Sequence, residues 1–194
     1  MEKTYCYSQH LFENLVGAAL PRFAELAPKI HRVQMARGEQ VFAQDSVHPF
    51  GYVVLSGLVK LVYLGEDGSE WIKSFCVQGE FFASLTALDR EGKTSFAVVA
   101  VEECVLERIA YADLEALALY ELTWERMLRR AFQIFSAKKE KRERELLTLT
   151  PEQRYAVFAQ DEPSLLQRIP QKDLARYLGI TAVGLNRIVK RHNA

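Results

Sequence analysis

Four polar side chains near the end of the chain could together bind nucleic acid. Asn186 can form paired hydrogen bonds with the edge of an adenine, and Arg187 can bind a guanine edge or a phosphate. Lys190 and Arg191 suit contacts with phosphates, which position a protein on a duplex without reporting its base sequence. These residue types predict a DNA-binding surface, provided that a single helix presents them on one face.

The element that would present them is a helix-turn-helix. Gly179 lies four residues after Ala175, and Leu185 lies ten after it, which is the spacing of this motif. The small Ala175 suits the helix crossing, Gly179 suits the positive φ of the turn, and Thr181 is placed to cap the second helix. The apolar positions are filled by Leu174, Leu178, Ile180, Leu185 and Ile188. The residues expected to contact DNA are Thr181, Ala182, Val183, Asn186, Arg187, Lys190 and Arg191.

The distribution of charge agrees with a nucleic-acid-binding end. The formal net charge is zero, yet residues 1–125 carry 10 Lys and Arg against 18 Asp and Glu, while residues 126–194 carry 15 against 7. The first part is therefore at −8 and the second at +8. An acidic body with a basic tail is typical of nucleic-acid binding, although a solvated helical face would have a similar composition.

The body ahead of these helices is rich in short β-forming runs. Residues 51–64 hold two such runs, broken at Ser56 and Gly57, and residues 65–70 have the composition of a hairpin turn. Short, regularly spaced strands predict an antiparallel β-roll, or double-stranded β-helix. The expected fold class is α+β: an N-terminal antiparallel β-roll flanked by helices, a long helix, and an all-α helix-turn-helix at the C-terminus.

The long helix is predicted between residues 113 and 147. An apolar seam begins there with 4-3-4 spacing, and a helix of this length is difficult for so small a domain to bury alone. The seam residues expected at a dimer interface are Trp124, Leu128, Ala131 and Phe135. The alternative is that this helix folds back on its own roll.

A break around residues 147–150 separates this helix from the basic tail. Thr150 suits an N-cap, Pro151 the first helical position and Gln153 the third. The predicted division is an effector-like roll over residues 1–112, a dimerisation helix over 113–147 and a DNA-binding domain over 148–194.

Several other classes of protein lack support in the sequence. Cys6, Cys76 and Cys104 are too widely spaced for a disulfide framework or a zinc site, and the four histidines are scattered singly. No nucleophile–base arrangement or phosphate-binding glycine loop is visible, so we expect no catalytic residues, no metal and no enzyme. No run is long enough to span a membrane, and there is no basic-then-apolar leader, so we expect a cytoplasmic protein with no membrane partner.

The combination of roll, long helix and terminal helix-turn-helix resembles the Crp/Fnr superfamily of transcription regulators. Gly57 and Gly79 fall at the family's recurrent turn glycines, and residues 150–188 are similar to a branch that ends soon after the recognition helix. The chain is therefore identified as resembling a member that lacks the β-hairpin wing. The resemblance implies a homodimer whose partners are double-stranded DNA and RNA polymerase.

The effector pocket departs from the pattern of the cyclic-nucleotide-binding members. The pocket of the family would fall on Gly79, Glu80, Phe81, Phe82, Ser84, Thr94 and Ser95. Gly79 and Glu80 match the family, but the Arg-Ser pair that holds the cyclic phosphate falls on Thr94 and Ser95. Threonine supplies no charge for a phosphate, unless Lys93 or Arg90 reaches the site. We therefore expect no cofactor, weak or absent binding of cyclic AMP, and an unknown effector or none.

The sequence leaves two functions open. The first is a homodimeric, sequence-specific DNA-binding regulator. The second is a ligand-sensing or protein-interaction module whose DNA-binding end has decayed. Ala182 and Val183 favour decay because they can contact only a thymine methyl, and Gly184 costs a helix about 1 kcal/mol relative to alanine. Arg187 and Lys190 favour retained binding.

Overall fold

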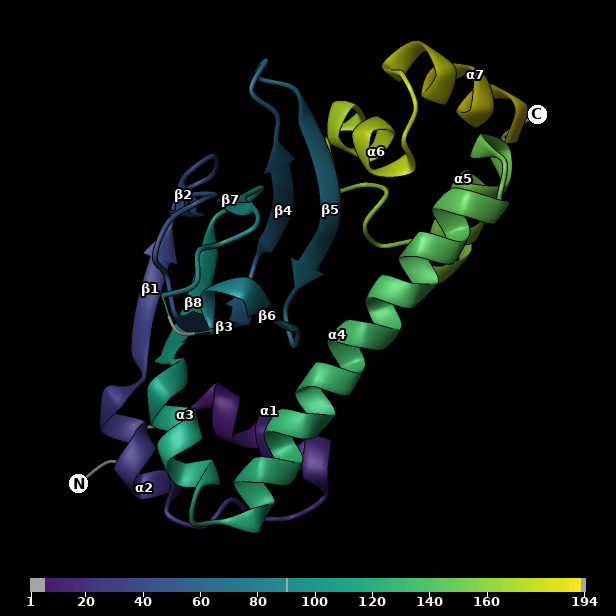
Figure 1. The fold of residues 1–194 in the computed structure, drawn as a ribbon. Coiled ribbons are helices and arrows are strands. Elements are labelled where there is room, and N and C mark those ends of the chain that lie inside the picture. The colour runs from purple at the N-terminus through teal and green to yellow at the C-terminus, as the bar shows by residue number, and fades with distance from the viewer. Residues whose placement is uncertain (1–5, 90, 193–194) are drawn as a thin grey trace.

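The computed structural model describes residues 6–89 and 91–192 (Figure 1). Its body is an antiparallel β-roll of two four-stranded sheets, with strand orders β1-β8-β3-β6 and β2-β7-β4-β5. The strands are β1 (His31–Met35), β2 (Gln40–Phe42), β3 (Phe50–Ser56), β4 (Leu58–Leu64), β5 (Glu70–Val77), β6 (Phe81–Ala83), β7 (Ala97–Ala100) and β8 (Cys104–Ala110). A single 3-10 turn, η2 (Leu85–Ala87), follows β6. The predicted α+β class with an antiparallel roll is confirmed.

Strand alternation gives the sheet β2-β7-β4-β5 two apolar faces. Along β4, Val59 and Leu61 point into the roll, where they join the core formed between the two sheets. Leu58 and Val62 point outward and are also buried, at 0% and 2% exposed. The outer face must therefore be covered by another part of the chain, because a sheet facing water on one side carries polar residues there.

The turn between β3 and β4 requires a glycine. Gly57 has φ +92°, and a Cβ atom there would lie 2.4 Å from the carbonyl oxygen of Glu103. The backbone of Glu103 and Cys104 and the thiol of Cys104 leave no room there for a side chain. The turn glycine expected at this position is thus explained by close packing of two loops.

The N-terminal helices cover the open end of the roll. They are α1 (Tyr7–Val16), α2 (Phe23–Leu26) and the 3-10 turn η1 (Ala27–Lys29). The carboxylate of Glu107 on β8 is 1% exposed and accepts hydrogen bonds from the backbone N–H groups of Tyr7, at 3.1 Å, and Ser8, at 2.8 Å. A side chain about 100 residues away thereby satisfies the free donors at the start of α1.

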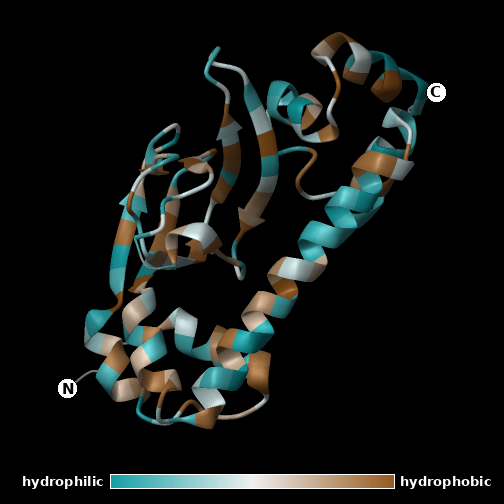
Figure 2. Cartoon of the chain, viewed as in Figure 1, coloured by the Kyte–Doolittle hydropathy of each residue, from teal (hydrophilic) through white to brown (hydrophobic). Residues whose placement is uncertain are grey.

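The helical region after the roll is divided in two. A short helix, α3 (Tyr111–Ala118), is followed by the 27-residue α4 (Leu122–Thr148). Figure 1 shows α4 as a rod that runs from the N-terminal helices to the C-terminal ones. Figure 2 shows that its second half is mainly hydrophilic, as the charged residues of that part of the sequence predict.

The first half of the predicted seam packs against its own chain. Trp124 is fully buried, donates a hydrogen bond of 2.7 Å to the carbonyl of Pro21 and stacks on Phe23. The ring of Phe135 meets Phe81 of the roll edge-on at 5.0 Å between centroids. Assigning Trp124 to a dimer interface was therefore wrong, because this side chain has no surface to offer a second copy. Seam spacing identifies an apolar helix face but not the partner that covers it.

Three helices complete the chain: α5 (Pro151–Asp161), α6 (Gln171–Leu178) and α7 (Ala182–His192). The predicted cap of α5 is confirmed as a reciprocal pair. The N–H of Gln153 donates to Thr150 Oγ1 at 3.3 Å, and the N–H of Thr150 donates to Gln153 Oε1 at 2.9 Å. We call residues 151–192 the helical domain.

Two findings concern the chemistry and the environment of the chain. All three cysteines are free thiols buried in the fold. Among the described residues, no helix combines the length and the apolar character that crossing a bilayer requires.

Candidate nucleic-acid interface

The geometry of α6 and α7 is that of a helix-turn-helix. Gly179 ends α6 with φ +68°, and the N–H of Ile180 returns to the carbonyl of Ala175 at 3.0 Å. Thr181 Oγ1 accepts a hydrogen bond of 3.1 Å from the N–H of Gly184, which is the predicted cap of the second helix. The crossing is locked by the buried Leu174, Ala175, Leu178, Leu185 and Ile188. The roles expected of the small residue, the turn glycine and the cap are confirmed.

The outward face of α7 is open to solvent. All seven residues predicted to contact DNA are exposed: Thr181, Ala182, Val183, Asn186, Arg187, Lys190 and Arg191. Arg191 lies 3.6 Å from Glu152 in an exposed ion pair. Within the described part of the chain, Asn186, Arg187 and Lys190 form no hydrogen bond or ion pair. The donors of this face are therefore available to an external acceptor such as a phosphate or a base edge.

A groove runs along the base of this face. It has a volume of about 350 Å³ and lies between the start of α5 and α7. Its lining includes Gly184, Arg187 and Arg191. Glu152 also lines the groove and pairs with Arg191, so Arg187 is the cation there that is open to an anionic ligand.

The turn at Gly79 and Glu80 in the predicted effector pocket, which we call the effector turn, is closed by a lysine from α4. Glu80 Oε2 accepts a hydrogen bond of 3.0 Å from the N–H of Val77, and Glu80 Oε1 is paired with Lys138 Nζ. Burial disfavours the charged form of Lys138, but the hydrogen bond and charge of Glu80 outweigh it and raise the pKa of this lysine. Lys138 lies three residues after Phe135 and so continues the 4-3-4 spacing of the predicted seam, and that spacing could have shown that it faces the roll. The carboxylate of Glu80, which matches the pocket of the family, is thus already engaged.

The hydroxyl groups of Thr94 and Ser84 in the predicted pocket also have partners. Thr94 is 1% exposed; its Oγ1 donates to the carbonyl of Ala43 at 2.6 Å and accepts from the N–H of Ser46 at 3.0 Å. Ser84 Oγ accepts from the N–H of Ser95 at 3.0 Å. These bonds tie neighbouring loops together. The residues present do not fit a cyclic phosphate, because the position of the phosphate-binding arginine holds a buried, fully bonded hydroxyl.

Aromatic rings fill the roll behind this turn. Phe82 is 1% exposed and stacks on Tyr52 at 5.1 Å, while Phe42 lies 5.8 Å from Phe96 and 4.8 Å from the ring of His48. Burial raises the pKa of Tyr52 to about 12, and burial lowers the pKa of His48. Phe82, expected to line a pocket, is a core residue here, and Phe81 packs on α4.

Of the two cations proposed to replace the arginine, the structure describes one. Lys93 is exposed, and its carbonyl accepts a hydrogen bond of 2.7 Å from Thr86. Arg90 lies outside the described residues. Across residues 6–89 and 91–192, no group of three or more His, Cys, Asp or Glu is arranged to hold a metal ion.

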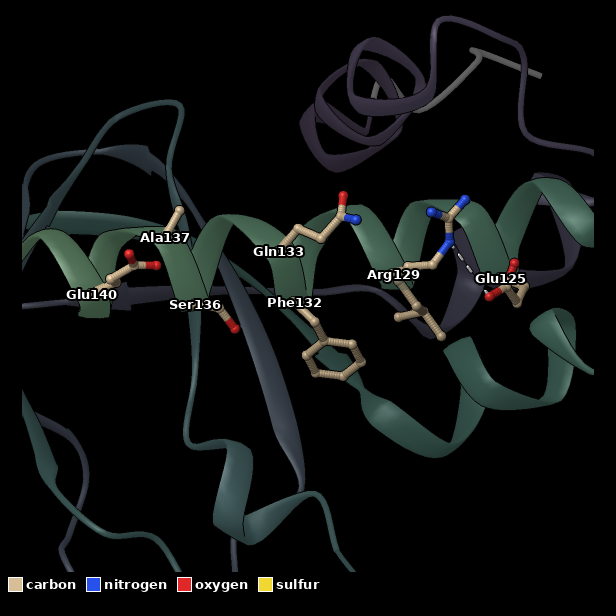
Figure 3. Close-up of a pocket in the computed structure, with 8 residues that line it drawn as sticks. Glu125, Arg129, Phe132, Gln133, Ser136, Ala137 and Glu140 are labelled. Atoms are coloured by element: carbon tan, nitrogen blue, oxygen red, sulfur yellow. Dashed lines mark ion pairs between the residues drawn. The ribbon is translucent and has the colours of Figure 1, made fainter.

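A second exposed surface runs along α4, away from the roll (Figure 3). It is a groove of about 540 Å³ lined entirely by α4 residues: Glu125, Leu128, Arg129, Phe132, Gln133, Ser136, Ala137 and Glu140. Figure 3 shows Phe132 projecting from the helix near the Glu125–Arg129 ion pair, whose atoms are 3.8 Å apart. Leu128 belongs to the predicted seam, but Phe132 was missed. The sequence pattern that could have identified Phe132 is a second row of residues with 4-3-4 spacing: Glu125, Arg129, Phe132 and Ser136. Each of them follows a residue of the predicted seam by one position.

Comparison with known proteins matches the body of the chain to a described domain. Residues 32–120 match the family model of the cyclic nucleotide-binding domain. The nitrogen fixation regulation protein FixK of Azorhizobium caulinodans is 36% identical over 83 residues, which cover 43% of this chain and 32% of FixK. The matched segment thus spans about a third of the length of that relative.

Three solved structures share the fold over most of the chain. FixK2 from Bradyrhizobium japonicum has a TM-score of 0.74 at 19% identity, covering 84% of this chain and 83% of its own. The c-di-GMP-responsive global regulator CLP of Xanthomonas campestris has a TM-score of 0.70 at 20% identity, covering 88% and 90%. The catabolite activator protein of Thermus thermophilus has a TM-score of 0.56 at 23% identity, covering 91% and 85%. The roll, the long helix and the terminal helices are therefore a shared architecture.

Proposed function

We propose that the chain is a homodimeric transcription regulator of the Crp/Fnr type that binds DNA sequence-specifically, and the cyclic nucleotide-binding domain match, the similarity to FixK and the shared architecture support this proposal. The observation that carries this proposal is the outward face of α7. Asn186, Arg187 and Lys190 are exposed on the second helix of a helix-turn-helix, the helix that enters the major groove in this motif. Phosphate contacts supply most of the affinity, since the helix begins with the apolar Ala182 and Val183.

We assign the dimer interface to the exposed groove of α4. Regulators of this fold act as dimers, and Leu128 and Phe132 give the groove an apolar centre between charged residues. A two-fold dimer presents one α7 from each subunit, so the DNA site is a near-palindrome whose half-sites lie about 34 Å apart, one helical turn. Of the predicted seam, Leu128 is the residue that lines this groove.

We further propose that cyclic AMP and cyclic GMP are not the effectors. Glu80 is paired with Lys138, and Thr94 is buried with both of its bonding capacities used. Regulation therefore depends on another effector or on none.

A second function is favoured by one observation. Val183 is 62% exposed at the start of α7, and Gly184 follows it inside the helix. Such a helix suits a module that keeps the fold and has lost base recognition.

Selection of bound duplexes from a random DNA pool separates the two functions. A regulator enriches a near-palindrome, and Arg187→Ala relaxes the preference at one base pair of each half-site, at about 1–3 kcal/mol. Arg22→Ala, which removes an exposed cation from the N-terminal helices, is the matched control and leaves the selected site unchanged. If the wild-type protein enriches no sequence at physiological salt, the decayed module replaces the regulator.

A further inference from the structure

The outer face of the sheet β2-β7-β4-β5 is covered by the helical domain. Leu58, Ile72 and Phe75 from the sheet form one continuous buried cluster with Leu174 and Leu178 from α6. Phe75 also meets the ring of Tyr177 at 5.5 Å. Figure 1 shows α6 lying beside β5, which is the edge strand of this sheet. The roll and the helical domain thus share a core and are not joined by the chain connection alone.

Polar side chains hold this contact at two places. On α6, Asp173 is bound by both oxygens to Lys60 Nζ on β4, at 3.0 and 2.9 Å. These side chains are 9% and 15% exposed, and Arg176 beside them pairs with Glu70 of β5. Their burial and mutual bonding fix the position of α6 along the strands, because a buried charge that loses its partner is costly.

The second place lies between the roll and the loop before α6. Arg168 binds Glu102 through two hydrogen bonds, at 2.9 and 2.7 Å, and donates a third, at 3.1 Å, to the carbonyl of Gly57. A two-point contact of this kind fixes orientation as well as distance. This acceptor, the carbonyl of Gly57, belongs to the turn that tolerates only glycine, so the position of the carbonyl is well defined.

The inner face of the recognition helix contributes Leu185 and Ile188 to the shared core, and its outward face takes no part in this docking. α7 contacts α5 and α6, and its outward face is exposed while α6 is docked on the sheet. We propose that the roll sets the orientation in which α7 meets DNA, with Lys60, Glu102, Arg168 and Asp173 as positioning residues. This inference rests on the proposed function. The docked arrangement is the DNA-binding one, because undocking would expose the shared apolar core without uncovering any more of α7.

Reversing one charge of the Arg168–Glu102 pair tests this inference. Glu102→Arg repels Arg168, and the side chain of Glu102 is 34% exposed, so the new charge is not forced into the core. The matched control is Glu103→Arg, which makes the same charge change at the exposed neighbouring position. Binding to the selected site is measured by fluorescence anisotropy, and docking is measured by hydrogen exchange of α6 and β4.

Glu102→Arg should bind the selected DNA site about tenfold more weakly, because about a tenth of the molecules would then keep the helical domain docked on the roll. Exchange of α6 should rise in the same variant. If only the net charge mattered, Glu102→Arg would bind DNA more tightly, because the added positive charge attracts phosphates. The control Glu103→Arg should show this charge effect alone. Arg168→Glu should also lose affinity, and the double variant Glu102→Arg with Arg168→Glu should recover most of it.

Other outcomes overturn the inference. Tighter binding by Glu102→Arg than by Glu103→Arg would mean that docking restrains DNA binding. Unchanged affinity with raised exchange would mean that docking does not position α7, and unchanged exchange in all the variants would mean that this pair does not hold the domain. If the wild-type protein selects no DNA, the proposed function fails, while the exchange measurement still decides whether the pair maintains docking.

Discussion

The two surfaces at which relatives of this chain would meet their ligands differ in one respect. On α7, Asn186, Arg187 and Lys190 are exposed and have no partner among the described residues. At the effector turn, Glu80 is paired with Lys138, and Thr94 is bonded to Ala43 and Ser46. Polar groups that lack internal partners must bind water or a ligand, whereas satisfied groups have little to gain from one. Under the proposed function, the outward face of α7 offers free donors to DNA, whereas the polar groups at the effector turn are bonded within the protein.

Two half-buried aromatic residues of α4 differ in where they lie: Phe132 lines the exposed groove and its ring also meets Tyr111 edge-on, whereas Phe135 packs on Phe81 of the roll. We expect the largest effect at Phe132. Phe132→Glu places a charge in the exposed groove of each subunit, so the dimer should dissociate while the subunit stays folded. Loss of the second half-site should lower DNA affinity roughly 10²-fold. Light scattering gives the mass, and fluorescence anisotropy gives the affinity.

Two variants sharpen this test. Leu147→Glu adds the same charge at an exposed position of α4 beyond the groove and should remain dimeric. Phe135→Glu, which removes the ring packed on Phe81, should lower the free energy of unfolding by about 2–4 kcal/mol. A dimer that survives Phe132→Glu would show that the interface lies outside this groove.

A smaller effect is expected from a single phosphate contact. Lys190→Ala should weaken binding to all DNA sequences about equally, and the slope of log K against log salt should fall by roughly one unit per half-site. Titrations at several salt concentrations measure that slope on the selected site and on an unrelated duplex. A loss confined to the selected site would instead assign Lys190 to a base.

The smallest effect is expected at the effector end. With a dissociation constant above the millimolar range, cyclic AMP at a millimolar concentration should stabilise the protein by less than about 0.4 kcal/mol. Lys138→Ala, which frees Glu80, should not change this, because the phosphate would still lack a cation. Calorimetry that detects micromolar binding of cyclic AMP to the wild-type protein would contradict the difference drawn between the α7 face and the effector turn. Binding gained by Lys138→Ala alone would show that the ion pair is the obstacle.

Short-range features could be predicted from the sequence because they depend on neighbours. The Thr150–Gln153 cap, the positive φ of Gly179 and the cap at Thr181 each involve residues a few positions apart. The partner of an apolar face cannot be predicted in this way. Trp124 fits a seam equally well whether it faces a second copy or its own Pro21.

The same limit applies to the contact between the roll and the helical domain. Lys60 and Asp173 are 113 residues apart, and neither has a pattern that points to the other. The internal bonds of Thr94 were hidden for the same reason, since Ala43 lies 51 residues away.

The cap that Glu107 provides for α1 has a consequence during synthesis. The N–H groups of Tyr7 and Ser8 leave the ribosome about 100 residues before the carboxylate that satisfies them. Until β8 is made and paired between β1 and β3, α1 has neither its cap nor the core that buries Phe12. A ten-residue helix is marginal in water without such support. The first helix in the chain is therefore among the last elements to become stable, and a ribosome that stalls before residue 107 displays a nascent chain with an uncovered apolar N-terminus.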